Sequence, residues 1–277
     1  MLRTMMVGLD NSAFTQSAIE WGIQTSARFD ALLVGLGVID LEGIGGSEPV
    51  PLGGGSFKRE RDEARAKDAH RQVRIVLDGF AQRCAQAQVA CKELEEEGSP
   101  SECISTIAQR YDLIVLGQES HFSFETQTAS DATRDEVIRR SPRPVVVVPQ
   151  AFSPGEEIVI AYDGSVQAAH AVQSFQSLEL YRDQKVHVVS IHSEVKVAAK
   201  WADRIIDFLH FHHVDAQPHA IGSGSRPQDV LLDFLSRRKV SMLVMGAYGK
   251  PTWREFFFGT VTKRILAECP VPIFISH

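Results

Sequence analysis

The feature that most constrains the fold is an internal duplication. Met5–Asp10 reads MMVGLD and Ile158–Asp163 reads IVIAYD; in each case a Ser stands two residues after the Asp, and an amphipathic helical pattern follows. A second landmark recurs later in each half, as DLIVLG at 112–117 and MLVMG at 242–246. Each half then closes on a Pro-x-Pro strand, SPRPVVVVPQ or CPVPIFISH. Three landmarks repeated in one order predict two tandem copies of one domain.

The spacing of these landmarks suggests where the domains divide. A chain of 277 residues suits two domains of about 100–200 residues each. We predict domains at 1–150 and 155–277, joined by the short segment QAFSP. The two Asp residues, 10 and 163, are 153 residues apart, but the two Gly residues, 117 and 246, are 129 apart, so the first copy has 24 extra residues. The surplus falls in Glu42–Arg59, whose Gly, Pro and Ser residues predict a flexible loop.

Apolar strands alternate with amphipathic helices, which predicts an α/β fold. Such units form a parallel sheet with helices on both faces, so we expect two tandem Rossmann-like domains, each a five-stranded parallel sheet flanked by helices. In the second copy we expect strands at 157–162, 185–191, 215–220, 241–245 and 272–276, and helices at 166–181, 195–212, 227–238 and 261–268. Ligands of these sheets bind beyond the carboxyl ends of the strands, where the strand order reverses. The Asp-x-Ser tripeptide stands at that edge and is typical of a helix N-cap.

Composition excludes several classes of protein. The net charge is −6, which does not favour nucleic acid or an anionic membrane as partner. The four cysteines form no CxxC pair, which is typical of free thiols in a reducing cytosol. No apolar run reaches the ~18 residues of a membrane span, and no signal peptide is recognisable, so we expect a cytoplasmic protein.

A glycine-rich segment of the second copy has the pattern of a phosphate-binding loop. Gly246-Ala-Tyr-Gly249 is followed after nine residues by Gly259-Thr260-Val261, which opens the last helix. Glycines let the backbone approach an anion, and a helix N-terminus offers unpaired N–H groups and a positive dipole end. Positive charge is available nearby from Lys250, Arg254 and Lys263. From these residues alone, phosphate binding and an ordinary Gly-containing turn with a capping Thr remain equal alternatives.

The chain resembles the universal stress proteins in their tandem-domain form. The resemblance is carried by the strand–Asp-x-Ser start and Pro-x-Pro closing strand of each copy, and by the spacing of Gly246, Gly249, Gly259 and Thr260. In that family the spacing belongs to members that bind ATP. The resemblance therefore implies an adenine nucleotide α-hydrolase-like fold and an ATP ligand, alone or with magnesium, held by the second copy.

The resemblance also implies roles for residues outside the loop. Asp163 would lie beside the adenine or ribose, and the backbone of Ile191 would meet the adenine edge. Ala161 stands where family members often have Pro, so that wall of the pocket differs. Pro251 replaces a small polar residue and removes one backbone donor, which bears on how tightly ATP is held.

The first copy keeps only part of this pattern. Asp10 and Val38 match the two base-end positions, and Gly117 matches the first glycine. The second glycine, the third glycine and the hydroxyl residue are replaced by Ser120, Ser130 and Asp131. A carboxylate at the last position repels a triphosphate. We therefore predict that the first copy does not bind ATP, or takes at most adenosine or a monophosphate.

Three functions remain open on the sequence. The first is an ATP-binding stress or regulatory protein with at most slow hydrolysis, since no nucleophile has a convincing base partner. The second is an enzyme acting on adenine nucleotides, and the third is a scaffold that binds no nucleotide. We expect the closing strands VVVVP and PIFIS to pack together as an intramolecular pseudo-dimer, because apolar edges are rarely left open. A homodimer and a protein partner are left open.

The remaining motifs receive structural interpretations. Ile221–Pro227 reads IGSGSRP, which lacks the third glycine of a dinucleotide site and predicts a strand-to-helix turn. His210, His212 and His213 are interpreted as a helix end rather than a metal site, and Glu95–Glu97 as a solvated loop edge. Lys58–Arg74 is interpreted as the exposed face of a long helix, and Trp201 with Phe208 as a core-packing pair.

Overall fold

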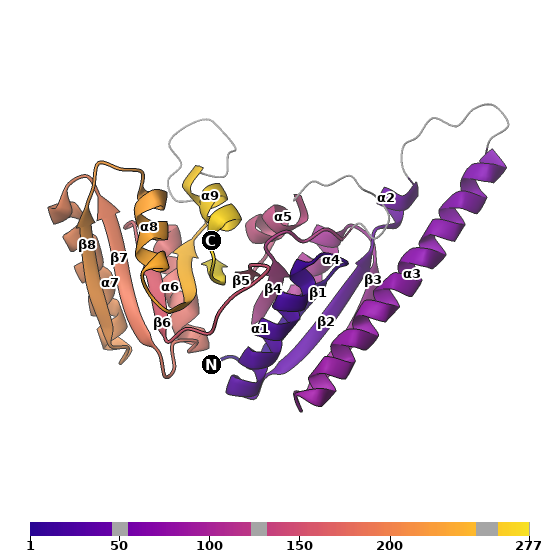
Figure 1. The fold of residues 1–277 in the computed structure, drawn as a ribbon, viewed down its shortest axis with the longest axis horizontal. Helices are drawn as coiled ribbons and strands as arrows, with labels where there is room; N and C mark the ends of the chain where they lie inside the picture. The colour runs from indigo at the N-terminus through magenta and orange to yellow at the C-terminus, as the bar shows by residue number, and fades with distance from the viewer. Residues whose placement is uncertain (46–54, 123–131, 248–259, 277) are drawn as a thin grey trace. The chain divides into compact units, whose positions relative to one another are not determined.

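The computed structural model describes residues 1–45, 55–122, 132–247 and 260–276 (Figure 1). The chain divides into two compact units. The first unit is Arg3–Pro142, and the second is Arg143–His277 together with Met1–Leu2.

The first unit is built on four parallel strands in the order β3-β2-β1-β4. The strands are β1 Thr4–Leu9, β2 Leu32–Ile39, β3 Cys91–Glu97 and β4 Leu113–Gly117. The helices are α1 Phe14–Phe29, α2 Leu41–Gly45, α3 Gly55–Gln86, α4 Pro100–Ile107 with the short 3₁₀ turn η1 Ala108–Arg110, and α5 Ala132–Arg140. The strand order reverses between β1 and β4, which are neighbours in the sheet but far apart in the chain.

The second unit has the strand order β5-β10-β9-β6-β7-β8. Its strands are β5 Val145–Val148, β6 Glu157–Ala161, β7 Lys185–His192, β8 Ala216–Gly222, β9 Val240–Gly246 and β10 Ile273–Ser276. Its helices are α6 Val166–Leu178, α7 Val195–Phe211, α8 Pro227–Ser236 and α9 Thr260–Glu268. All nine elements predicted for the second copy are present, and strands β6 to β10 run parallel, as expected.

Strand β5 joins the second unit although it closes the first copy in sequence. It pairs antiparallel with β10, and Val146 stands opposite Phe274. The two closing strands therefore pair with each other, as the sequence analysis expects. The first sequence repeat therefore includes β5, whereas the first compact unit ends at Pro142, because β5 is hydrogen-bonded to β10 of the second unit.

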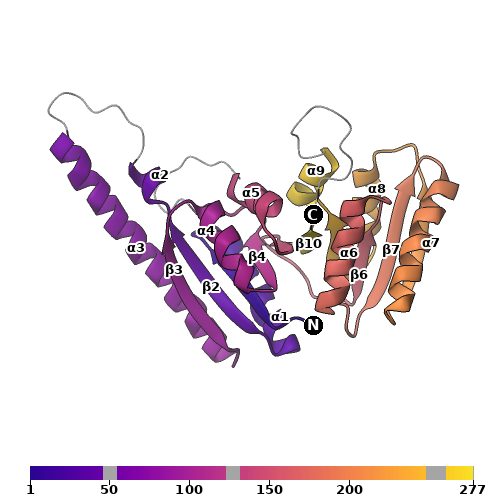
Figure 2. The same cartoon turned by 180° about the vertical axis from the view of Figure 1, so that it is seen from behind.

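Helices cover both faces of each sheet. In the second unit α6 and α7 lie on one face and α8 and α9 on the other, as opposite views show (Figures 1 and 2). In the first unit α1 and α3 pack on β1 and β2. Central strands are almost wholly buried, from Met5 to Leu9 in β1 and from Ile158 to Ile160 in β6. These apolar runs are typical of parallel strands with both faces covered.

Two predicted loops are partly regular structure. Residues 41–45 form α2 and residues 55–59 open α3, so the ends of the stretch predicted as a flexible loop are helical; residues 46–54 lie outside the described residues. The prediction of a loop edge at Glu95–Glu97 was wrong, because these residues end strand β3. Alternate side chains of this strand face α3, where Arg74 contacts Glu93 at 2.8 Å and His70 contacts Glu95 at 2.7 Å. The carboxylates are thus tolerated in a strand because Arg74 and His70 of the covering helix contact them.

The cysteines, the helices and the histidines of the described residues bear on the remaining expectations. All four cysteines are free. None of the described helices is both long and apolar enough to cross a membrane. In the same part of the chain no three His, Cys, Asp or Glu side chains are grouped as metal ligands. His213 has φ +58° just after α7, consistent with the predicted helix end.

Candidate functional site

The candidate site lies at the carboxyl edge of the second sheet, where the strand order reverses between β6 and β9. Two loops leave the sheet at this point, one after Ala161 and one after Gly246. Ala161 pairs with Met245 of β9 and with Val189 of β7, and its side chain is half-buried. The edge between diverging crossovers is where α/β sheets hold ligands.

The Asp-x-Ser tripeptide of the second copy forms the predicted helix cap. The Ser165 hydroxyl accepts a hydrogen bond from Ala168 N at 3.1 Å, and Asp163 Oδ1 accepts one from Ser165 N at 3.0 Å. Gly164 between them has φ +76°, a conformation that suits glycine. The Asp163 side chain is exposed. Its carboxylate is therefore fixed in position but remains accessible to a ligand.

The backbone of Ile191 points past the end of strand β6. Tyr162 N donates to Val189 O at 2.9 Å. Because alternate residues of a strand direct their N–H and C=O groups to the same neighbouring strand, those of Ile191 also face the β6 side. The Tyr162 carbonyl is instead taken by the Ser190 hydroxyl at 2.7 Å. Among the described residues no hydrogen bond to the β6 side uses the N–H or C=O of Ile191. An adjacent donor and acceptor at a half-buried residue can pair with the polar edge of a planar base.

The start of helix α6 packs directly against the end of strand β9. A Cβ added to Gly246 would stand 2.4 Å from Ala168 N, so only glycine fits here. Helix α9 begins at Thr260 and continues through Val261, and it leads into β10, which is parallel to β9. Its N-terminus therefore lies at the same edge of the sheet, where a helix dipole favours an anion. Gly249 and Gly259, with the intervening Lys250, Pro251 and Arg254, lie outside the described residues.

Trp201 also lies at this edge, beside the Asp-x-Ser tripeptide. It was interpreted as a core-packing partner of Phe208, but it is only half-buried and lies against Gly164. A Cβ at Gly164 would stand 2.7 Å from the indole Nε1. His192 packs edge-on to the indole ring, with centroids 5.1 Å apart. The sequence signal for this contact was Gly164 itself. The first copy has Asn11 at the equivalent position, and a glycine here allows another side chain to approach closely.

In the first unit the carboxylate of the corresponding residue, Asp10, accepts hydrogen bonds from neighbouring residues of its own chain. Asp10 is 1% exposed, and its Oδ1 accepts hydrogen bonds from Ser12 N at 3.1 Å and Ser12 Oγ at 2.7 Å. Thr15 Oγ1 also donates to Oδ1, and His121 N donates to Oδ2. The Ser12 hydroxyl also accepts a hydrogen bond from Phe14 N at 3.3 Å at the start of α1, as predicted for this tripeptide, although the residue directly before the helix is Ala13.

Residues after β4 fill the corresponding edge of the first unit. Phe122 is 2% exposed, and a Cβ at Gly8 would stand 2.9 Å from its ring. Gly8 is the counterpart of Ala161 in the second unit. Val38, the counterpart of Ile191, is wholly buried, and the Ser120 hydroxyl turns back to Gly117 O at 3.2 Å. Residues 123–131, including Ser130 and Asp131, lie outside the described residues.

A family model for the universal stress protein family matches the chain twice, at residues 1–149 and 156–277. The two matches span nearly all of both copies. The chain belongs to the universal stress protein family. The two matched segments correspond to the tandem repeat predicted from the sequence.

Several relatives match the chain over nearly its whole length. The universal stress protein Slr1230 of Synechocystis sp. is 20% identical over 98% of this chain and 99% of its own length. A universal stress protein structure from Archaeoglobus fulgidus is 17% identical, with a TM-score of 0.71 and coverage of 99% of this chain and 97% of the other. A functionally unknown protein from Pseudomonas aeruginosa PAO1 is 12% identical, with a TM-score of 0.62 and coverage of 99% and 92%. At these identities the structures show a common fold.

Within this universal stress protein fold, the structure brings most of the predicted site residues to one edge. Ala161, Asp163, Ile191 and Gly246 end or follow β6, β7 and β9, which are neighbours in the sheet. Thr260 and Val261 open α9 at the same edge. At this edge the acidic side chain is exposed in the second unit and enclosed in the first.

Proposed function

We propose that the chain binds one adenine nucleotide, ATP, in its second unit and acts as a nucleotide-dependent regulatory protein of the stress-protein type. The observation that carries the proposal is the open backbone edge of Ile191 beside the exposed Asp163. The N–H donor and C=O acceptor of Ile191 complement N1 and the 6-amino group of adenine. Asp163 then accepts from the ribose hydroxyls, which are donors.

The phosphates extend toward α9 in this proposal. Backbone N–H groups at Thr260 and Val261 and the helix dipole stabilise the negative charge. Gly249 and Gly259 complete the cradle by their spacing in sequence, and magnesium accompanies the triphosphate only if the phosphates supply most of its ligands. Asp163 stands at the sugar end, so it is not a base for water attack at the γ-phosphate. We expect hydrolysis far below the about 10 s⁻¹ typical of enzymes.

Calorimetric titration tests the proposal. We expect one equivalent of ATP per chain, and binding at least about tenfold weaker for GTP, because guanine presents an acceptor and a donor in the reverse order and leaves both Ile191 groups unpaired. Asp163→Ala should lose most of the affinity, and the matched variant Asp10→Ala should not gain a second site. Two equivalents of similar affinity would overturn the asymmetry. Absence of any heat or thermal shift with ATP would favour the scaffold.

A further inference from the structure

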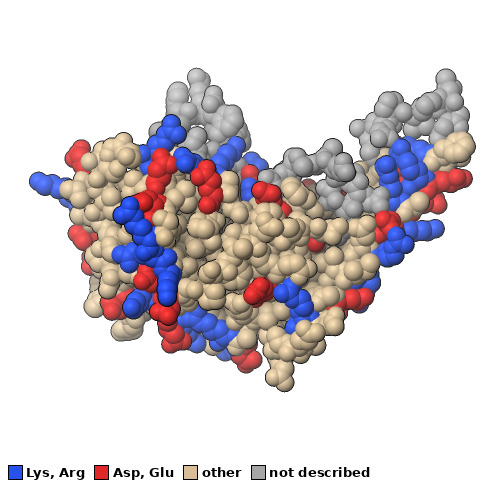
Figure 3. Space-filling model, viewed as in Figure 1, with Lys and Arg blue, Asp and Glu red and all other residues tan. Residues whose placement is uncertain are grey.

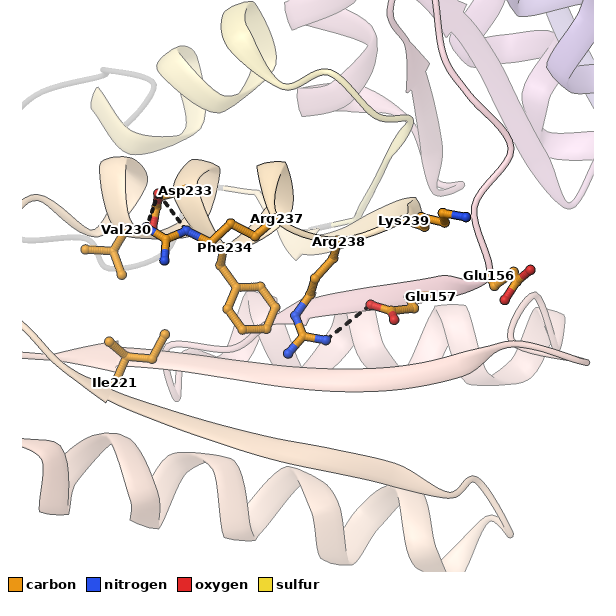
Figure 4. A pocket seen from close by; sticks show the side chains of 9 residues that line it. All are labelled: Glu156, Glu157, Ile221, Val230, Asp233, Phe234, Arg237, Arg238 and Lys239. Atoms are coloured by element: carbon orange, nitrogen blue, oxygen red, sulfur yellow. Dashed lines mark hydrogen bonds and ion pairs between the residues drawn. The ribbon is translucent and has the colours of Figure 1, made fainter.

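A second polar feature of the second unit lies apart from the nucleotide edge. A groove of about 690 Å³ runs between helix α8, the start of β6 and strand β8 (Figure 4). Its apolar wall is formed by Ile221, Val230 and Phe234, and its other end carries Glu157 and Arg238. Figure 3 shows charged side chains of both signs gathered in a stripe along α8. Beneath this stripe the sheet carries ionisable residues in its interior.

Three ionisable side chains form a row across three neighbouring strands. Glu157 of β6, His187 of β7 and His219 of β8 follow one another along the face that α8 covers. His187 Nδ1 lies 3.0 Å from His219 Nε2, a hydrogen bond between the two rings. His187 Nε2 lies 3.5 Å from Glu157 Oε2. His187 is only 3% exposed, and this Nε2 is buried without a hydrogen bond among the described residues.

Helix α8 is fastened to the sheet by contacts with this row. Arg238, just after the helix, lies 3.3 Å from Glu157 Oε2. Phe234 packs edge-on to His219 at 5.1 Å, and the Arg238 guanidinium lies 4.6 Å above the Phe234 ring. In Figure 4 Phe234 and Arg238 point from α8 toward the sheet, whereas Arg237 turns back to Asp233. The C-terminal end of α8 thus depends on Glu157.

Both histidines are neutral in this arrangement. Burial is the largest cause that lowers the pKa of His187 and of His219. Glu157 opposes the shift at His187, while Arg238 and Lys185 reinforce it. The hydrogen bond between the two rings uses one N–H. A further proton on either ring therefore produces an imidazolium and adds a positive charge to the row.

We propose that the Glu157–His187–His219 row is an acid-responsive latch that holds helix α8 on the sheet at neutral pH and releases it when the histidine pair takes up a proton. An imidazolium at His187 competes with Arg238 for the same carboxylate oxygen and repels the guanidinium. His187 is fixed in a central strand, whereas the Arg238 side chain is 31% exposed. Arg238 therefore leaves, and the groove beneath Phe234 opens.

The release of α8 also reaches the nucleotide edge. Asp229 of α8 pairs with Arg264 of α9 at 2.8 Å, and α9 begins at Thr260. Weaker ATP binding in acid follows from this contact; this consequence rests on the function proposed above, whereas the latch itself needs no nucleotide.

Hydrogen exchange of the full-length chain without nucleotide tests the latch. We expect protection of the α8 amides from Leu231 to Leu235, corrected for intrinsic rates, to fall by about tenfold per pH unit below about 6.5, because one proton is bound in the open form. Protection in α7 should stay constant. Equal protection of α8 at pH 7.5 and 5.5 would overturn the proposal.

Two variants and one control sharpen the test. His187→Gln should remove most of the pH dependence of α8, and Arg238→Met should make α8 exchange rapidly even at pH 7.5, as the wild type does in acid. His210→Gln changes an exposed histidine of α7 and should leave the wild-type behaviour. If His187→Gln fails to fold, NMR signals of the wild-type imidazole rings provide the test. Coupled titration of His187 and His219 below pH 6.5 supports the latch, and independent titration near about pH 6.5 overturns it.

ATP titrations at the two pH values separate the latch from the proposed function. Loss of ATP binding at both values with intact α8 exchange behaviour refutes the nucleotide proposal alone. ATP binding together with equal α8 protection at pH 7.5 and 5.5 refutes the latch alone.

Discussion

Asp10 and Asp163 follow equivalent strands, yet their side chains have opposite uses. Asp10 is enclosed and accepts hydrogen bonds from Ser12, Thr15 and His121. Asp163 is exposed and accepts one local hydrogen bond, from Ser165 N. A carboxylate that satisfies buried donors stabilises the fold, whereas an exposed one contributes little to it and remains available to a ligand.

Substitution of the two aspartates should therefore separate stability from binding. Asp10→Ala leaves buried donors unpaired and should lower the free energy of unfolding by about 1–3 kcal/mol. Asp163→Ala should change it by less than about 0.5 kcal/mol. Urea denaturation of both variants measures the difference. Equal effects on stability would contradict the contrast between the two residues.

Gly164 is constrained by both its backbone and its neighbour. It has φ +76°, and the Trp201 indole leaves no space for a Cβ. Gly164→Ala should destabilise the chain by about 1–2 kcal/mol, from left-handed strain and displacement of Trp201. Gly224→Ala is the matched control, because a Cβ there meets no atom within 4 Å. Comparable unfolding midpoints for the two variants would show that the contact with Trp201 is unimportant.

At the scale of elements, periodicity predicted the second copy well. Strands β6, β7, β9 and β10 are mainly apolar segments, helix α6 follows the Ser165 cap, and helix α8 begins at Pro227. Local pattern failed where the partner decides the structure. The acidic strand β3 was predicted as a loop because the side chains that contact its carboxylates stand on α3. Trp201 was assigned to the core because its neighbour Gly164 lies far away in the sequence.

Burial of the histidine row predicts how stability depends on pH. The pKa values of His187 and His219 are lowered in the folded state, so the unfolded chain takes up protons first as the pH falls. The free energy of unfolding should therefore be fully retained above about pH 6.5 and should decline below it.

Urea titrations between pH 7.5 and 5.5 measure this decline. His219→Gln should flatten it, while His210→Gln should reproduce the wild type. A steeper loss in the His219 variant would point to other groups as its origin.

At the scale of the whole molecule, the duplication is structural and the proposed chemistry is confined to one half. The matching edge of the first unit is already occupied by Phe122, and His121 N donates a hydrogen bond to Asp10 there. The sequence indicated the loss of glycines in the first loop, and it gave no sign that the same loop folds inward. That outcome depends on Gly8, which leaves room for the Phe122 ring.

Nucleotide should therefore stabilise one half of the chain only. With ATP at 100 times its Kd, opening of the second unit should cost about 2.7 kcal/mol more than without ligand. Hydrogen exchange of β6 and β7 amides should slow accordingly, and β1 and β2 amides should be unchanged. Slowing in both sets of strands would contradict a single binding unit.

The inward loop of the first unit can be regarded as a ligand that the chain carries with it. A tethered group competes at an effective concentration in the millimolar range or above, set by its short connection. Any nucleotide approaching that edge must displace Phe122 and His121 before it gains a contact, at a concentration that dilution of the protein never lowers. Under the proposed function, the first unit is thus filled by its own side chains, and the second unit is the one expected to respond to nucleotide.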